Sequence, residues 1–241
     1  MAFQFTEGEV LLIDKPQGWT SFDVVNFIRS FVRKMYDIKK LKVGHAGTLD
    51  PLATGLLIIC TGKMTKKINE YQGLDKIYVG QMKLGATTPS LDKETGEEKQ
   101  FDISHLMEAD LYKTAEKLTG SLDQIPPMYS AVWIEGKRAY QLARNQKEKV
   151  MEPRKVMVHE FKLLNIHLPY VDFYVKSSKG TYIRSLARDF GKFLNNGAYL
   201  TDLRRTQIGT FNVKDAYTME AFKDAVLKET GGNLKKMPVN D

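Results

Sequence analysis

The sequence predicts an α+β fold, in which a mixed and largely antiparallel sheet is flanked by helices and loops. Strand-like stretches recur along the chain, and only some of them are followed by a helix-like stretch. Residues 154–168 and 170–178 are two such stretches separated only by Pro169, which indicates a hairpin and antiparallel pairing. A doubly wound parallel fold would need a helix after nearly every strand, so the mixture favours α+β.

The first half of the chain alternates between predicted strands and helices. Residues 9–14 are a short apolar run typical of a buried strand, and Thr20 or Ser21 then caps a helix. That helix covers 22–36, because its apolar residues recur at helical spacing. The other predictions here are a central strand at 55–62, the start of a helix at 65–71, a strand at 76–85 and a polar loop at 86–102.

The second half is predicted to contain hairpins as well as helices. Residues 106–119 have the apolar spacing of a helix, whereas two prolines exclude a helix at 123–131. A turn at Glu135-Gly136 indicates a hairpin, followed by a short helix. The remaining predictions are a helix opened by Gly180-Thr181 with Ile183, Leu186, Ala187 and Phe190 facing inward, a strand at 201–211 and a closing helix at 219–229.

The composition indicates a folded, basic protein. The 241 residues are 42% hydrophobic and carry a formal net charge of +7, which suggests a polyanionic partner. A single cysteine, Cys60, excludes an intramolecular disulfide, and the four histidines are too scattered for a metal site, so we expect no metal. Neither a signal peptide nor an apolar stretch of membrane-spanning length is evident. We therefore expect a cytoplasmic protein without membrane association.

The stretch "VGHAGTLDPLATGLL" at 43–57 holds the main candidate for chemistry, Asp50. Aspartate before proline is a common turn device, so Asp50 could serve the turn alone. The glycines of this stretch, however, allow the backbone to approach a ligand closely. The apolar strand that follows would hold the carboxylate rigidly, as a nucleophile or general base requires. His45 could be a general base, a stacking surface or a packing residue.

A second candidate region is the predicted helix start within 177–189. A helix N-terminus carries partial positive charge, so Arg184 in the first turn is electrostatically out of place. It is either held by an acidic partner or an anionic substrate, or solvated on an exposed face. Tyr78, in the middle of a predicted strand, either packs in the core or stacks on a base.

Basic residues gather just before the Asp50 loop. In residues 29–45 six lysines and arginines stand against one acid, Asp37. Such a run is either a solvated helix face or a patch that contacts phosphates. Arg204 and Arg205 supply another possible contact to a phosphate backbone.

Five motifs, in this order along the chain, resemble those of the TruB family of pseudouridine synthases. They are "IDKPQGWTS", "GHAGTLDPLATGLL", "KIYVGQMKLG", "IPPMYSAVWIEGKRAYQLAR" and "SKGTYIRSLARDFG", and they cover about residues 9–212. The resemblance implies the pseudouridine synthase catalytic fold and a reaction without cofactor or metal. A uridine in the T loop of tRNA, at position 55, becomes pseudouridine: the N-glycosidic bond is cut, the uracil turns, and a C–C bond forms from C5.

The same resemblance assigns site residues by their positions in the motifs. Asp50 matches the family's catalytic aspartate, and Tyr78 the tyrosine that stacks on the target base. Tyr182 and Arg184 match the active-site tyrosine and the arginine that pairs with the aspartate. Substrate-binding roles fall to His45, which holds flipped-out nucleotides, Leu203, which lines the uracil pocket, Asp92, which also pairs with Arg184, and Lys15 and Arg204.

Two departures from the family pattern matter. Its members often carry a C-terminal RNA-binding PUA domain, whereas here only 213–241 follow the region that the resemblance covers. We expect a single catalytic domain over 1–241, with core motifs at about 9–212, a short helical extension at 213–241 and no full PUA domain. Trp133 stands where the family usually has a lysine, so a phosphate contact is lost or the indole stacks on RNA.

Two other functions compete with the enzymatic one. The chain could be an RNA-binding or tRNA-folding protein, or a member of the related archaeal and eukaryotic branch guided by small RNAs. Asp50, Tyr78 and Arg184 together favour an enzyme, because binding alone would not need a carboxylate facing a phosphate-rich ligand. We therefore expect a stand-alone monomer that acts on the T arm of tRNA and requires no protein partner.

Overall fold

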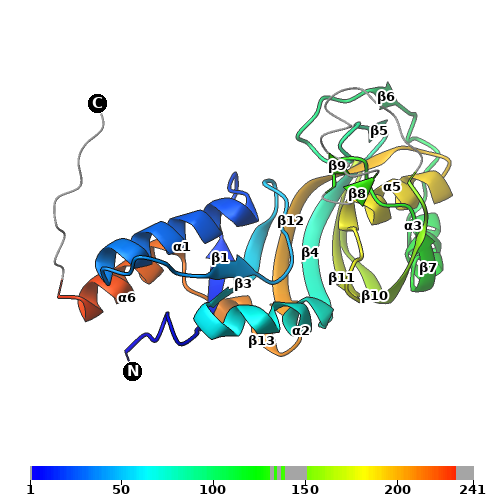
Figure 1. Ribbon diagram of the computed structural model, residues 1–241. Coiled ribbons are helices and arrows are strands. Elements are labelled where there is room, and N and C mark those ends of the chain that lie inside the picture. Colours follow the sequence, from blue (N-terminus) through cyan, green and yellow to red (C-terminus); the bar gives the residue numbers. More distant parts are fainter. Residues whose placement is uncertain (1, 131–132, 135–136, 139–150, 232–241) are drawn as a thin grey trace. The chain divides into compact units, whose positions relative to one another are not determined.

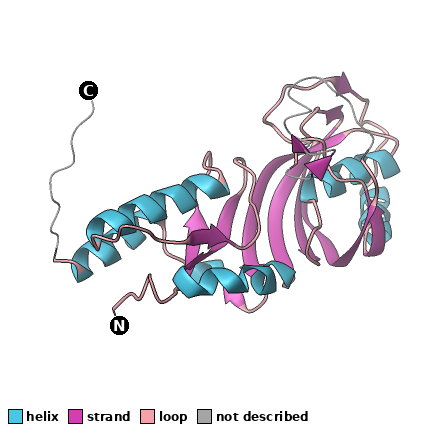
Figure 2. Ribbon diagram, in the orientation of Figure 1, coloured by secondary structure: helices cyan, strands magenta, loops and turns pink. Residues whose placement is uncertain are grey.

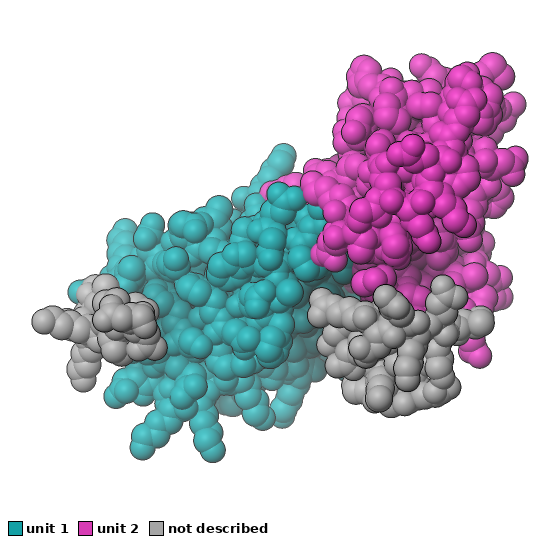
Figure 3. Space-filling view, turned by 90° about the horizontal axis from the view of Figure 1, so that it is seen from above, with its two compact units in different colours: residues 1–74, 205–241 teal, residues 75–204 magenta. Residues whose placement is uncertain are grey.

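The structure, a computed structural model, describes residues 2–130, 133–134, 137–138 and 151–231 (Figure 1). The chain divides into two compact units, residues 1–74 with 205–241 and residues 75–204 (Figure 3). The predicted turn at Glu135-Gly136 and the short helix after it lie outside the described residues. None of the described helices is both long and apolar enough to cross a membrane.

The first unit contains a small sheet with helices. Its elements are β1 (Val10–Lys15), α1 (Ser21–Met35), β2 (Val43–His45), β3 (Thr54–Thr61), the 3₁₀ helix η1 (Gly62–Lys67), α2 (Ile68–Gly73), the end of β12 (Ala198–Ile208), β13 (Phe211–Asn212), the 3₁₀ helix η2 (Val213–Asp215) and α6 (Met219–Glu229). The strand order is β1-β3-β12, and β1 and β2 both pair antiparallel with β3. The apolar run at 55–62 is thus a central strand, as predicted.

Both faces of β3 are covered within this unit. On one face Leu57 and Ile59 belong to a core that includes apolar residues of α1 and α6. On the other face Leu56, Ile58 and Cys60 belong to a second cluster. A strand covered on both faces carries apolar residues at nearly every position, which explains why the sequence shows no alternation there.

The start of α1 follows from its capping residues. The Thr20 side chain accepts a hydrogen bond from the Asp23 amide, and the Asp23 carboxylate accepts one from the Thr20 amide. These two bonds satisfy amide groups that the first helical turn leaves without partners. Of the two predicted caps, Thr20 is therefore the N-cap, and Ser21 is the first helical residue.

The second unit is an antiparallel sheet with helices packed on it (Figure 2). Its elements are β4 (Lys76–Leu84), β5 (Ala86–Thr87), β6 (Lys99–Gln100), α3 (Glu108–Lys117), β7 (Gly120–Gln124), β8 (Trp133–Ile134), β9 (Lys137–Arg138), β10 (Arg154–His167), β11 (Tyr170–Ser177), α5 (Ile183–Phe193) and the start of β12. The strand order is β12-β4-β11-β10-β7, and the pairs β4–β11, β10–β11 and β7–β10 are antiparallel. The predicted α+β class with a largely antiparallel sheet is confirmed.

The helix α5 packs on this sheet through its apolar face. Ile183, Leu186, Ala187 and Phe190 are all buried, as the sequence predicts. The Phe190 ring lies 5.7 Å from that of Phe161 on β10. The predicted start at Gly180-Thr181 is one or two residues too early, because Tyr182 is the N-cap.

Two smaller predictions also need correction. The stretch 86–102 is not entirely loop, because β5 and β6 pair across it. The strand predicted at 201–211 begins at Ala198 and ends at Ile208, where Gly209, with a φ of +54°, turns the chain back into β13.

Candidate functional site

Asp50 lies in the loop between β2 and β3 of the first unit. The Ala53 amide donates to the Asp50 carbonyl over 3.1 Å, which closes a tight turn around Pro51. Gly47 and Gly55 flank this turn with φ values of +102°, a conformation that favours glycine. The turn interpretation of Asp50 is therefore correct for its backbone.

Contacts from the first residue of α1 and from the turn before it hold both neighbours of Asp50. The buried Ser21 hydroxyl accepts a hydrogen bond from the Leu49 amide at 2.8 Å and donates to the Leu49 carbonyl at 3.2 Å. The Gly18 amide donates to the Pro51 carbonyl at 2.8 Å. The backbone on each side of Asp50 is thus tied to the same segment.

Arg205, from the end of β12, reaches the same loop within this unit. Its side chain is 1% exposed and donates from Nε to the Leu56 carbonyl (2.7 Å), from Nη2 to the Gly47 carbonyl (3.0 Å) and from Nη1 to the Thr48 carbonyl (3.4 Å). The prediction that Arg205 contacts a phosphate backbone does not describe this geometry, because the guanidinium is buried among protein carbonyls.

Lys15 is a buried cation near this loop. Its ammonium donates to the carbonyls of Pro16 (2.9 Å) and Trp19 (2.6 Å). Burial lowers the pKa of Lys15 to about 8; the charge of Asp50 opposes this shift, and that of Arg205 adds to it. At neutral pH Lys15 therefore still carries positive charge beside Asp50.

His45 is half-buried at the end of β2. Burial lowers the pKa of its imidazole, and the positive charge of Arg205 lowers it further. The imidazole is therefore neutral at neutral pH, which suits a packing or hydrogen-bonding role and excludes a permanent positive charge.

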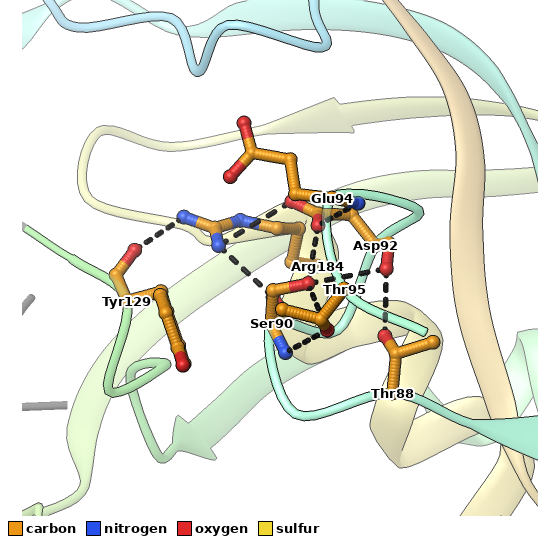
Figure 4. A network of polar contacts seen from close by, with 7 residues as sticks. All are labelled: Thr88, Ser90, Asp92, Glu94, Thr95, Tyr129 and Arg184. Carbon is orange, nitrogen blue, oxygen red and sulfur yellow. Dashed lines mark hydrogen bonds and ion pairs between the residues drawn. The ribbon is translucent and has the colours of Figure 1, made fainter. Parts of the chain in front are cut away.

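In the second unit, Arg184 is held by a network of polar groups (Figure 4). Its side chain is 4% exposed, which makes the alternative of a solvated arginine wrong. Nη1 donates to the Ser90 carbonyl at 3.0 Å and lies 3.5 Å from Asp92 Oδ2, while Nη2 donates to the Tyr129 carbonyl at 2.7 Å. The predicted pairing of Arg184 with Asp92 is confirmed.

Asp92 is itself fixed by neighbouring groups. Its carboxylate is fully buried, and Oδ1 accepts from the Ser90 hydroxyl (2.5 Å) and from the Glu94 amide (3.0 Å). The Ser90 hydroxyl also lies 2.8 Å from that of Thr95, and Thr88 donates to the Asp92 carbonyl (Figure 4). Because Oδ1 is occupied, Oδ2 is directed to the arginine.

Two hydrogen bonds hold the backbone of Tyr182, the N-cap of α5. The buried Gln124 side chain accepts from the Tyr182 amide at 2.8 Å and donates to the Tyr182 carbonyl at 3.1 Å. Ile125, which follows Gln124, accepts a hydrogen bond at its carbonyl from the Ser185 hydroxyl of α5 at 2.8 Å. The end of β7 thus positions the start of α5.

Tyr78 and Leu203 lie on β4 and β12 of the second unit. Tyr78 is 8% exposed, and Leu203 is also buried. Gly80, between them, lets the strands approach closely, because a Cβ there would lie 2.6 Å from the Asp202 carbonyl oxygen and 3.2 Å from Leu203 Cδ1. Because Tyr78 is almost entirely buried, its ring leaves only a small surface for stacking on a base.

The basic residues at 29–45, just before the Asp50 loop, differ in how far they are exposed. Arg29 is half-buried and donates to the Asn26 side chain and the Val43 carbonyl, so it is partly structural. The exposed members are Arg33, Lys34, Lys39, Lys40 and Lys42. Arg204 is half-buried on β12, and the side chain of Trp133 lies outside what the structure describes.

The predicted site residues divide between the two units. Lys15, His45 and Asp50 belong to the first unit; Tyr78, Asp92, Tyr182, Arg184, Leu203 and Arg204 belong to the second. The predicted pairing of Asp50 with Arg184 joins the two units and stays a prediction. Among the described residues, no group of three His, Cys, Asp or Glu side chains could hold a metal ion.

Sequence reasoning missed several residues that hold this site. Ser90 and Gln124 were not singled out, Ser21 was considered only as a helix cap, and Arg205 was assigned a different contact. Their partners are far away in sequence in most cases: 28 residues for Ser21, 58 for Gln124 and up to 158 for Arg205. A local pattern contains no signal of such contacts.

Family models match most of the chain. Residues 33–183 match the N-terminal domain of TruB family pseudouridylate synthases, and residues 184–237 match the C-terminal domain of tRNA pseudouridylate synthase B. The chain is 50% identical over 224 residues to the tRNA pseudouridine synthase B of Flavobacterium johnsoniae, covering 92% of this chain and 98% of that protein. It is 47% identical over 220 residues to that of Phocaeicola vulgatus, covering 91% and 94%.

Solved structures agree with the sequence comparison. The fold resembles a chain of a Cbf5-Nop10-Gar1 complex, with a TM-score of 0.69 and 29% identity. That match covers 94% of this chain, which spans 57% of the matched one. On these grounds, the chain belongs to the TruB family of tRNA pseudouridine synthases, enzymes that isomerise uridine to pseudouridine in tRNA.

Proposed function

We propose that the protein isomerises the uridine at position 55, in the T loop of tRNA, to pseudouridine without a cofactor, and that Asp50 is its nucleophile or general base. The observation that carries the assignment of Asp50 is the fixation of its loop. Hydrogen bonds with Ser21, Gly18 and Arg205 hold the backbone before and after this carboxylate. Catalytic groups need such fixed geometry, because a misplaced group loses most of its advantage.

Positive charge supports the ionised form of Asp50. A buried carboxylate tends to become neutral, which would disable it as a nucleophile or base, whereas a nearby cation favours the charged form. Lys15 supplies such a charge from within the first unit. We assign the same role to Arg184, whose guanidinium is already oriented by Asp92, Ser90 and Tyr129.

The target uracil must leave the stacked T loop before any residue reaches it. Flipping a base out costs a few kcal/mol, which contacts in the pocket and along the backbone offset. In this proposal Tyr78 stacks on the base, Tyr182 is the active-site tyrosine, Leu203 lines the uracil pocket, and the neutral His45 holds the neighbouring flipped nucleotides. Asp92 acts through Arg184.

Binding of the T arm relies on phosphate contacts. The exposed lysines at 34, 39, 40 and 42, together with Arg204, are the proposed partners of the RNA backbone. The two units act as a single catalytic domain in a cytoplasmic monomer that needs no protein partner. Binding should therefore weaken steeply with added salt, as counterion release requires.

Tritium release from unmodified tRNA labelled with [5-³H]uridine tests the proposal. Wild type should release tritium, and Asp50→Asn should release none while binding tRNA with near-normal affinity. Asp37→Asn is the matched control, because Asp37 is exposed and lies outside the Asp50 loop. It should release tritium at the wild-type rate.

Two results would overturn parts of the proposal. Substantial turnover by Asp50→Asn would remove Asp50 from the chemistry. Tight tRNA binding by wild type without tritium release would instead favour an RNA-binding or tRNA-folding protein.

A further inference from the structure

We infer that Arg205 is a positioning residue for catalysis: its buried guanidinium clamps the two ends of the Asp50 loop and so sets where the carboxylate lies. The inference rests on the proposed role of Asp50 and adds a residue that does not touch the substrate. All the contacts involved lie within the first unit.

The clamp is defined by three hydrogen bonds on two sides of Asp50. Before Asp50, the carbonyls of Gly47 and Thr48 accept from Nη2 (3.0 Å) and Nη1 (3.4 Å). After Asp50, the carbonyl of Leu56 accepts from Nε at 2.7 Å. One rigid, planar group therefore fixes the loop entry relative to the loop exit.

Only arginine has the donors for this arrangement. A guanidinium presents five N–H groups in a fixed fork, whereas a lysine ammonium donates from a single point. Two glycines lie against Arg205, Gly47 beside its guanidinium and Gly55 beside its backbone. A Cβ on Gly47 would lie 3.6 Å from Arg205 Nη1, and a Cβ on Gly55 only 2.2 Å from the Arg205 carbonyl oxygen. Both glycines also have φ values that other residues rarely adopt.

The burial of a charge here argues against a role in stability alone. Arg205 is 1% exposed, and its hydrogen bonds described here go to carbonyls. Apolar side chains of similar volume usually fill a core at least as well as buried charges do. The arginine at this position therefore indicates that these carbonyls must point inward, and hence that the path of the loop matters.

The same guanidinium also shapes the electrostatics of the loop. Its charge contributes to the lowered pKa values of Lys15 and His45, which places all three groups within interaction range. An Arg205→Lys variant keeps the charge but loses the fork. This variant therefore separates the positioning of the loop from its electrostatics.

The experiment measures single-turnover tritium release with enzyme in excess over labelled tRNA, beside equilibrium tRNA binding. Arg205→Lys should slow release by about 10- to 100-fold, since small misplacements of catalytic groups cost this much, with the Kd for tRNA changed less than about threefold. Thr61→Val is the matched control. It removes the hydroxyl that bonds the Phe5 carbonyl and the Glu9 amide in the same unit, away from the loop. Thr61→Val should lose stability and keep the rate.

Amide hydrogen exchange provides a readout that does not depend on activity. Arg205→Lys should accelerate exchange at Leu49 and Ala53, and Thr61→Val should not. If Arg205→Lys does not fold, Gly47→Ala disturbs the same clamp from the loop side and should give the same rate loss. A release rate for these variants within twofold of the control, or unchanged loop exchange, overturns the inference. If wild type releases no tritium, the proposed function fails, and the exchange data alone decide on the clamp.

Discussion

The hydrogen bonds between the Gln124 side chain and the Tyr182 backbone lead to a prediction of how much stability a substitution removes. The Gln124 side chain is 2% exposed and makes two hydrogen bonds to the Tyr182 backbone, at 2.8 and 3.1 Å. Gln124→Met preserves the length and approximate volume of the side chain and removes both polar partners. The variant therefore tests the hydrogen bonds rather than the packing.

The expected loss follows from the groups left without partners. A hydrogen bond contributes about 1 kcal/mol net, and a buried polar group left unpaired costs about 1–3 kcal/mol. Tyr182 is only half-buried, so water can partly replace the lost partners. We expect Gln124→Met to lower the free energy of unfolding by about 2–3 kcal/mol, or to lower Tm by roughly 5–10 °C for a chain of this size.

Urea denaturation and single-turnover tritium release measure the two consequences. Activity should fall by at least about tenfold under conditions where the variant is folded, because the start of α5 also carries Arg184. Gln81→Met is the matched control in the same unit. Gln81 also makes two side-chain hydrogen bonds, with Asp172 and Thr201, each at 2.9 Å, but it does not contact α5 in these bonds.

The control should lose some stability and keep its turnover. The reasoning is refuted if the free energy of unfolding of Gln124→Met lies within about 0.5 kcal/mol of the wild-type value, because one unpaired buried group should cost more than that. It is equally refuted if the two methionine variants lose activity to the same extent.

Two further predictions concern Lys15 and Ser90. Burial lowers the pKa of Lys15 from 10.5 to about 8, so between these values the unfolded chain binds more protons and this group makes the fold more stable as pH rises. Urea denaturation from pH 7.5 to pH 10 should show that Lys15→Met lacks about 2 kcal/mol of this rise, and equal slopes would contradict the buried amine. Ser90→Ala should remove one of the two hydrogen bonds that hold Asp92 Oδ1 and slow tritium release about tenfold. Ser90→Thr should restore most of the rate, and failure of that rescue would show that the hydroxyl is not responsible.

The sequence by itself determined the local elements and the family. The helix α1 was predictable because apolar residues recur at helical spacing and Thr20 caps it. The strand β3 was predictable because a short apolar run bounded by glycines suits a strand covered on both faces. The order of the motifs identified the family, and Asp50 stands in the most specific of them. Each of these signals lies within a few residues of the feature it predicts.

Only the tertiary structure decided how the candidate site is held. Arg205 donates hydrogen bonds to carbonyls about 150 residues earlier in the chain, and Gln124 bonds the backbone of a residue 58 positions later. Arg184, in α5, is oriented by Asp92, which lies in a distant loop. The sequence indicated only a possible phosphate contact for Arg205, whereas the structure buries this side chain. A buried donor takes whichever acceptor the fold places beside it, and that acceptor is chosen by strand order and loop path rather than by neighbours in sequence.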